Sequence, residues 1–109
     1  RLLDDVDDVI DAACERAIHV HARVGHTQGP QVSDPRAPEF SPLRLRYESW
    51  WSRVKEARER DGAERLIVVP EYGPAPYLAT APFTREPLAD LWEVCLWQAN
   101  RLRELWGIA

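Results

Sequence analysis

The order of the predicted secondary-structure elements constrains the fold of this chain more than any other feature. Two short segments rich in β-branched residues, AIHVHARV at 17–24 and RLIVVP at 65–70, are typical of strands. A segment with helical periodicity lies between them, and two others precede the first strand and follow the second. Strands that alternate with helices form parallel sheets with the helices outside, so the sequence predicts an α/β fold.

The lengths of the connections indicate how such a sheet is organised. The predicted elements are a helix, a strand, a helix, a strand and a helix, at 2–16, 17–24, 43–60, 65–70 and 87–106. Long proline-rich loops follow both strands, whereas the helix-to-strand connections are short, as in a (β/α) barrel with its site at the strand ends. The almost unbroken apolar run of the second strand is typical of a strand buried on both faces. Because two parallel strands leave open edges, we expect further barrel strands or a partner chain to complete the sheet.

Composition narrows the class of protein. The chain has 109 residues, with 45% hydrophobic and 29% charged residues, which suits one small globular segment. Its formal net charge of −4 argues against nucleic-acid binding, which depends on clustered Lys and Arg. No apolar stretch approaches the ~20 residues that span a bilayer, and the acidic first residues do not resemble a secretory signal. Cys14 and Cys95 are expected to be free thiols within helices, so we expect a cytoplasmic protein without a membrane partner.

All three histidines of the chain lie in or just after the first predicted strand. Strand alternation places His19, His21 and Arg23 on one face, opposite a set of apolar side chains. Neutral imidazole is the commonest metal ligand among side chains, which favours a metal site on this face. Histidines that are held in a core by hydrogen bonds to neighbouring groups are the alternative.

A carboxylate directly follows the second predicted strand. Pro70 cannot donate to a sheet hydrogen bond, so the strand is expected to end there, with Glu71 at its C-terminal rim. A carboxylate at that rim is well placed to bind a cation or to move a proton, and an ordinary surface Glu is the alternative. In the first loop, His26, Gln28 and Gln31 are candidates for contacts with a polyol, or are solvated loop residues.

These residues together resemble a known family. HVHARVGHTQGPQVSDPRAPEF, followed by WW and then by IVVPEYGPAPY, resembles the C-terminal part of sugar phosphate isomerase/epimerase proteins, of the xylose isomerase-like TIM barrel superfamily. The resemblance runs from about residue 17 to residue 106 and covers roughly the last third of a family member. It implies that residues 1–109 are a single segment of a (β/α)8 TIM barrel, with the two strands as the seventh and eighth.

The resemblance also implies a cofactor and a set of site residues. One divalent cation, Mn, Mg, Co or Zn, is held in that superfamily by acidic and His side chains at strand ends. The family's His-x-His ligand matches His21, and its strand-ending Glu, a metal ligand and acid/base, matches Glu71. His19, Arg23 and His26 are then expected to contact the substrate, a small-molecule sugar or sugar phosphate. Because the family's other acidic ligands come from the fifth and sixth strands, we expect the isolated chain to be inactive.

The sequence therefore predicts a metal-dependent sugar (phosphate) isomerase or epimerase, here as an incomplete fragment. A non-catalytic remnant or assembly module, which pairs with another chain to close its sheet, is the alternative from a different class. An endonuclease of the apurinic-site type is disfavoured, because its site needs more His and acidic ligands and because an acidic surface suits DNA poorly.

Overall fold

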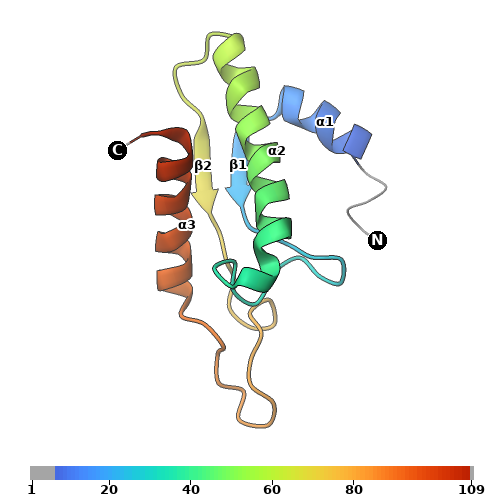
Figure 1. The fold of residues 1–109 in the computed structure, drawn as a ribbon, viewed down its shortest axis with the longest axis vertical. Helices are drawn as coiled ribbons and strands as arrows, with labels where there is room; N and C mark the ends of the chain where they lie inside the picture. Colours follow the sequence, from blue (N-terminus) through green and yellow to red (C-terminus); the bar gives the residue numbers. More distant parts are fainter. Residues whose placement is uncertain (1–6, 109) are drawn as a thin grey trace.

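The computed structural model describes residues 7–108 as a mixed α/β fold. Over these residues, a parallel two-stranded sheet of β1 (His19–Ala22) and β2 (Ile67–Pro70) packs with three helices. The helices are α1 (Asp7–Arg16), α2 (Ser41–Arg60) and α3 (Leu91–Trp106), and a single 3-10 turn, η1 (Pro38–Phe40), leads into α2. Figure 1 shows the helices beside the two strands. The α/β class and the parallel strands predicted from the sequence are confirmed.

Element boundaries differ from the predictions for local reasons. Both strands are shorter than predicted, because the parallel ladder pairs four residues of each, from His19 with Ile67 to Ala22 with Pro70. The final helix begins four residues later than residue 87, since the side chain of Asp90 caps it by accepting the N–H of Glu93 at 3.1 Å. Helix α2 begins at residue 41 instead of 43, after the 3-10 turn. Part of the predicted helix at 2–16, residues 2–6, lies outside the described residues.

The helices cover only one face of the sheet. Val20, Ala22 and Val24 point to the covered face and are buried. The side chains of Ala22 and Val24 are fully buried. On the other face, Ile67 is 57% exposed and Val69 is 37% exposed. The prediction that the second strand is buried on both faces is therefore wrong for the described chain, because no layer covers that side of β2. The 21 Å thickness of the molecule is that of one helix layer on one sheet.

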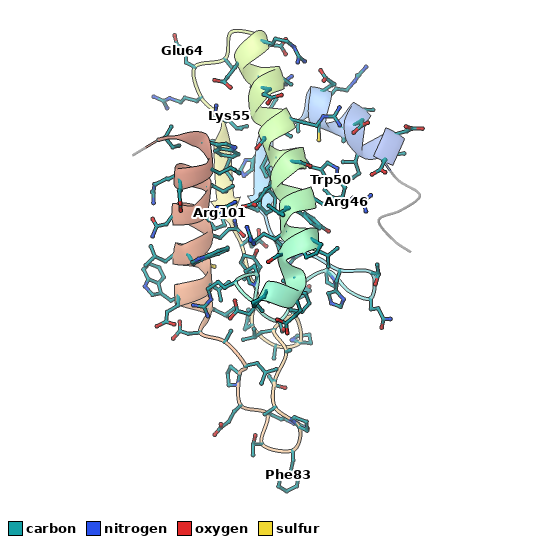
Figure 2. All side chains as sticks on the ribbon, viewed as in Figure 1. Arg46, Trp50, Lys55, Glu64, Phe83 and Arg101 are labelled. Atoms are coloured by element: carbon teal, nitrogen blue, oxygen red, sulfur yellow. The ribbon has the colours of Figure 1, made fainter. Side chains whose placement is uncertain are left out.

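A buried carboxylate joins α2 to α3. Glu48, which is 2% exposed, accepts from Nη1 of Arg44 at 3.0 Å and from Nε and Nη2 of Arg101 at 2.6 and 3.2 Å. Figure 2 shows Arg101 on the side of α3 that is turned toward α2. Nearer the C-terminal end of α3, the indole N–H of Trp106 donates to Oγ of Ser52 at 2.9 Å. Both oxygens of the buried carboxylate are thus paired with cations, as burial of a charge requires.

Helix α1 packs against α2 and beside the edge of β1. The buried Cys14 contributes to this contact, with its thiol donating to the Trp50 carbonyl, and Arg46 of α2 binds Asp7 at 2.6 Å. Cys14 and Cys95 are both free thiols. Within residues 7–108, no helix has the length and apolar character needed to cross a membrane.

Glu48→Ala should lower the free energy of unfolding by about 3 kcal/mol, because it leaves two partly buried guanidinium groups without their carboxylate. Urea unfolding followed by tryptophan fluorescence measures the loss. Glu56→Ala, at an exposed position of the same helix, is the matched control and should change the value by less than about 0.5 kcal/mol. A loss for Glu48→Ala no larger than that of the control would contradict the stabilising role of this carboxylate.

Candidate functional site

The C-terminal ends of β1 and β2 bring His21 and Glu71 together. The register pairs His21 with Val69, and Glu71 extends β2 by one residue, with its N–H donating to the Ala22 carbonyl at 3.2 Å. Because side chains alternate along a strand, Glu71 projects on the same side as Val69 and His21. Oε2 of Glu71 contacts Nδ1 of His21, and both side chains are about half exposed. The structure thus places the two residues predicted as metal ligands side by side.

Residues on either side of His21 share its face, as strand alternation predicted. The rings of His19 and His21 lie 4.9 Å apart between centroids. The guanidinium of Arg23 lies over the ring of Tyr77, 5.3 Å from its centroid. A hollow of about 300 Å³ adjoins the pair and is lined by His21, Arg23, Pro30, Tyr47 and Glu71. Three of the five predicted site residues therefore line one hollow, whereas His19 and His26 lie outside its lining.

His26 belongs to a tight turn. Its N–H donates to the Gly29 carbonyl at 2.9 Å, the Gly29 N–H donates back at 3.2 Å, and Nδ1 of its ring accepts the Gln28 N–H at 3.4 Å. These bonds shape the loop after β1 and occupy one ring nitrogen of His26. In this structure its observed contacts serve the turn, and a role in substrate binding remains a prediction.

Gln31 is buried instead of solvated, and its amide bonds within the protein. It is 5% exposed, so it is not a solvated loop residue. Its Oε1 accepts the Gly73 N–H at 2.8 Å and its Nε2 donates to the Gly73 carbonyl at 3.1 Å. The amide that was expected to contact a polyol is therefore used to join the loop after β1 to the loop after β2.

Sequence reasoning missed two tyrosines. Tyr47 reaches the hollow from α2, and a Cβ on Gly25 would lie 2.8 Å from its hydroxyl oxygen, so a side chain at position 25 would displace this hydroxyl. Burial raises the pKa of Tyr47, and a hydrogen bond from the Gly25 backbone opposes the rise. No pattern in the sequence points to Tyr47, because its neighbours on α2 are ordinary helix residues.

Tyr72, the second of these tyrosines, lies directly after Glu71 on the covered face. Its hydroxyl accepts the Val24 N–H at 3.2 Å and donates to Oε1 of Gln98 at 2.8 Å. Burial raises the pKa of Tyr72 far above its usual range, and the hydrogen bond from Val24 only partly opposes this. Its position after a strand-ending carboxylate is the one signal in the sequence that could have identified it.

The donor atoms at the strand ends fit a divalent cation in kind but not in number. Imidazole nitrogen and carboxylate oxygen are ligands that Zn²⁺ and Mn²⁺ accept. Catalytic zinc sites have three protein ligands, and the described part of the chain contains no group of three or more His, Cys, Asp or Glu placed to hold a metal. His21 and Glu71 are therefore a partial ligand set.

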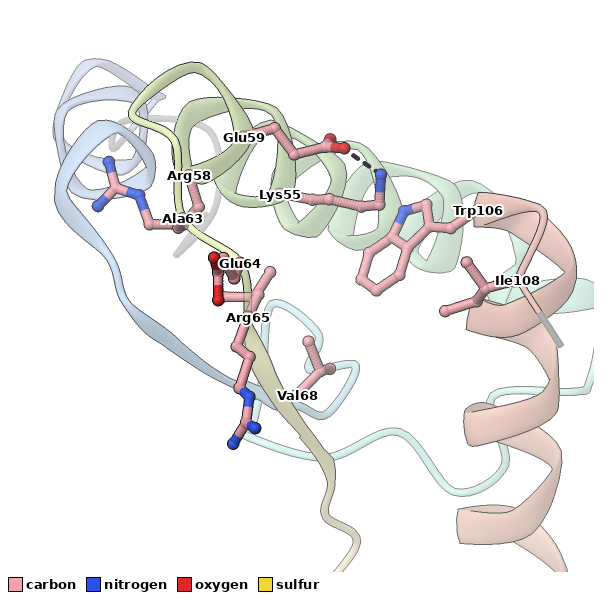
Figure 3. A pocket seen from close by; sticks show the side chains of 10 residues that line it. Lys55, Arg58, Glu59, Ala63, Glu64, Arg65, Val68, Trp106 and Ile108 are labelled. Carbon is pink, nitrogen blue, oxygen red and sulfur yellow. Dashed lines mark hydrogen bonds and ion pairs between the residues drawn. The ribbon is translucent and has the colours of Figure 1, made fainter.

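A second hollow, of about 260 Å³, lies at the opposite end of the sheet (Figure 3). It is formed where Glu64 and Arg65 lead into β2, and Trp106 closes its other side. Lys55 binds Glu59 at 2.9 Å, as the dashed line in Figure 3 shows. Ligand sites of parallel sheets form at the carboxyl ends of the strands, which is the other end, so we assign the candidate site to His21 and Glu71.

Comparisons of the chain with protein-family models, with curated proteins and with solved structures gave no significant match. The class of protein is therefore proposed from the residues at the strand ends and from the resemblance of the sequence.

Alkaline pH should destabilise the protein through Tyr72. Because its folded pKa is raised above the unfolded value near 10, the stability due to the neutral phenol is complete below pH 10 and is lost as the pH rises. One such group contributes a slope of at most about 1.4 kcal/mol per pH unit. Free energies of unfolding at about pH 8 and about pH 11 measure the loss, which should be smaller in Tyr72→Phe than in the wild type.

Tyr77→Phe is the matched control for this experiment, because the Tyr77 side chain is 51% exposed in the same loop. It should leave the alkaline loss of stability unchanged. Equal losses in the wild type and in Tyr72→Phe would contradict the buried state of the Tyr72 hydroxyl.

Proposed function

We propose that this chain is the C-terminal part of a (β/α)8 barrel that isomerises or epimerises a small sugar or sugar phosphate with the help of a divalent cation. The observation that carries the proposal is the contact between His21 and Glu71 at the carboxyl ends of two adjacent parallel strands. The hollow beside the pair, with Arg23 and Tyr47 in its lining, supports a polar substrate there. A cytoplasmic location is part of the proposal and is supported by the free thiols of Cys14 and Cys95.

The residues of the chain take distinct roles in this proposal. A bound cation would supply polarisation of the substrate carbonyl and its neighbouring hydroxyl. His21 would hold that cation through an imidazole nitrogen, and Glu71 would hold it through a carboxylate oxygen. Glu71 would also be one of two carboxylates that move a proton between neighbouring carbons of the sugar, and the second carboxylate would come from a barrel strand outside this segment. Arg23 donates hydrogen bonds to substrate oxygens from the rim of the hollow.

The partner of this segment is a further strand beside β1. Among the described residues, β1 pairs with β2 alone, so its other edge is open. An apolar groove of about 310 Å³ follows that edge, between α1, β1 and α2, and its lining includes Ile10, Cys14, Val20, Trp50 and Trp51. In the proposed barrel, a right-handed crossover would put a strand that precedes α1 beside β1 and parallel to it. We propose that the remaining strands of the barrel, or another chain, fill the groove and supply the missing ligands.

Mn²⁺ should bind the isolated chain weakly and at His21. A Mn²⁺ titration followed by paramagnetic broadening of the histidine ring resonances should broaden His21 first. His21→Ala and Glu71→Gln should each weaken the binding at least about tenfold, because each removes one of the two ligands. His26→Ala, which changes the turn histidine, is the control and should have little effect. Equal effects of all three variants, or no broadening, would favour the non-catalytic assembly module.

The isolated chain should be inactive with Mn²⁺. In deuterated water, it should incorporate no solvent deuterium into aldoses or ketoses above the protein-free rate, since a catalytic cation needs at least three protein ligands. Nuclear magnetic resonance of the sugar measures the incorporation. Turnover by the chain alone that is lost in Glu71→Gln would show that the two ligands suffice and that our view of an incomplete site is wrong.

A further inference from the structure

We infer that Tyr72, Gln98 and Gln31 form a clamp that positions Glu71 against His21. We call these three side chains the strand-end clamp. All three are buried polar groups that the proposed chemistry does not use. The inference rests on the His21–Glu71 pair of the proposed function, but it requires neither a particular metal nor a particular sugar.

The first part of the clamp joins the two strands beyond the end of their ladder. The last backbone bond between them runs from the Glu71 N–H to the Ala22 carbonyl. One residue later, the Tyr72 hydroxyl accepts the Val24 N–H at 3.2 Å and donates to Oε1 of Gln98 at 2.8 Å. A side chain thus continues the pairing where the backbone ladder has stopped, and it ties both strand ends to α3.

The second part of the clamp holds the next residue along the chain. The two hydrogen bonds between the Gln31 amide and the Gly73 backbone, at 2.8 and 3.1 Å, reproduce the paired bonds of a strand ladder. Gln31 is brought there because the Val32 N–H donates to the Val24 carbonyl at 2.9 Å, which returns the loop to the end of β1. Residues 72 and 73 are therefore fixed from opposite sides.

Gln98 orients the Tyr72 hydroxyl from α3. Its side chain is fully buried on α3, and its Nε2 has no hydrogen-bond partner among the residues that the structure describes. A buried donor without a partner lowers stability, and an apolar side chain in its place would not carry that cost. The amide at position 98 nevertheless supplies the acceptor that orients the Tyr72 hydroxyl.

The clamp acts on Glu71 through strand alternation. Because Tyr72 points to the covered face, its neighbour Glu71 must point to the open face, where His21 lies. The two site side chains are 60% and 46% exposed, and a contact between polar groups in solvent holds them in place only weakly. The direction of Glu71 is therefore set by the buried bonds of residues 72 and 73, which preorganise the pair from beneath.

The test compares the nitrogen chemical shifts of the His21 ring in a set of variants of the chain, without added metal. Glu71→Gln defines the shifts of His21 without its carboxylate neighbour. Tyr72→Phe and Gln31→Ala should each move the shifts more than half of the way to those values. Gln31→Glu, which keeps the acceptor for the Gly73 N–H and loses the donor, should give an intermediate shift. Far-ultraviolet circular dichroism shows whether each variant keeps its fold.

Two controls separate positioning from a general loss of structure. Tyr77→Phe makes the same chemical change at an exposed tyrosine, and Gln28→Ala changes an exposed residue of the same loop as Gln31. Both should leave the His21 shifts at their wild-type values. If Tyr72→Phe does not fold, the two Gln31 variants carry the test.

Two results would overturn the inference. The first is wild-type His21 shifts in folded Tyr72→Phe and Gln31→Ala variants, and the second is Glu71→Gln leaving those shifts unchanged. Because no metal or sugar is added, the outcome is independent of the Mn²⁺ titration. A chain that binds no Mn²⁺ but shows the expected shifts would retain the clamp and lose the proposed function.

Discussion

The parallel register between β1 and β2 is the constraint on which the rest of the structure depends. It pairs His21 with Val69 and Ala22 with Pro70, which brings Glu71 beside His21 on one face and Tyr72 beneath them on the other. A shift of one residue in β2 would turn Glu71 toward the helices and Tyr72 toward solvent, and the same shift in β1 would turn His21 away from Glu71. Helix α2 connects the two strands in this register, and its buried Glu48 binds Arg101 on α3, so the helix layer is held together with the sheet that it covers.

The two faces of the sheet carry different kinds of side chain. The covered face carries the apolar core, with Val20, Ala22 and Val24 against the buried indoles of Trp50 and Trp51. The open face carries the imidazoles, an arginine and the carboxylate, together with the partly exposed aliphatic side chains of β2. A histidine on a strand of this kind needs no buried partner, because its neighbours are solvent and another polar group. Such a face suits the mouth of a barrel better than it suits the surface of an isolated two-stranded sheet.

The sequence was sufficient to predict the elements and the face of each strand residue, because these follow from short-range periodicity. The alternation of His19, Val20, His21 and Ala22 set their faces directly, and Pro70 at the end of β2 marked where Glu71 would lie. Burial of the second strand on both faces was predicted wrongly. An apolar run such as Ile67 to Val69 shows that both faces of a strand could be buried, but it does not show whether another element covers them. The Asp90 cap shortened the final helix, since a capping side chain competes with a weakly helical first turn.

Contacts between loops were beyond sequence reasoning. Nothing local links Gln31 to Gly73, 42 residues away, or Tyr72 in the loop after β2 to Gln98 on α3. Both pairs exist only because the register aligns the strand ends and the loops return to them. The same long-range geometry explains why Tyr47 lines the hollow from α2. His26 is closer to His21 in the sequence, but its backbone forms a turn with Gly29 and it does not line the hollow.

Two buried polar side chains, Glu48 and Gln98, differ in how completely their polar atoms are paired. Glu48 has both oxygens paired with arginines and joins two helices, so its burial is fully compensated where the fold needs strength. Gln98 leaves one donor without a partner, in the same layer and at similar depth. Buried donors without a partner also occur elsewhere among the described residues, at Nε of Arg44 and of Arg58, so what links Gln98 to the direction of Glu71 is the acceptor that it offers the Tyr72 hydroxyl.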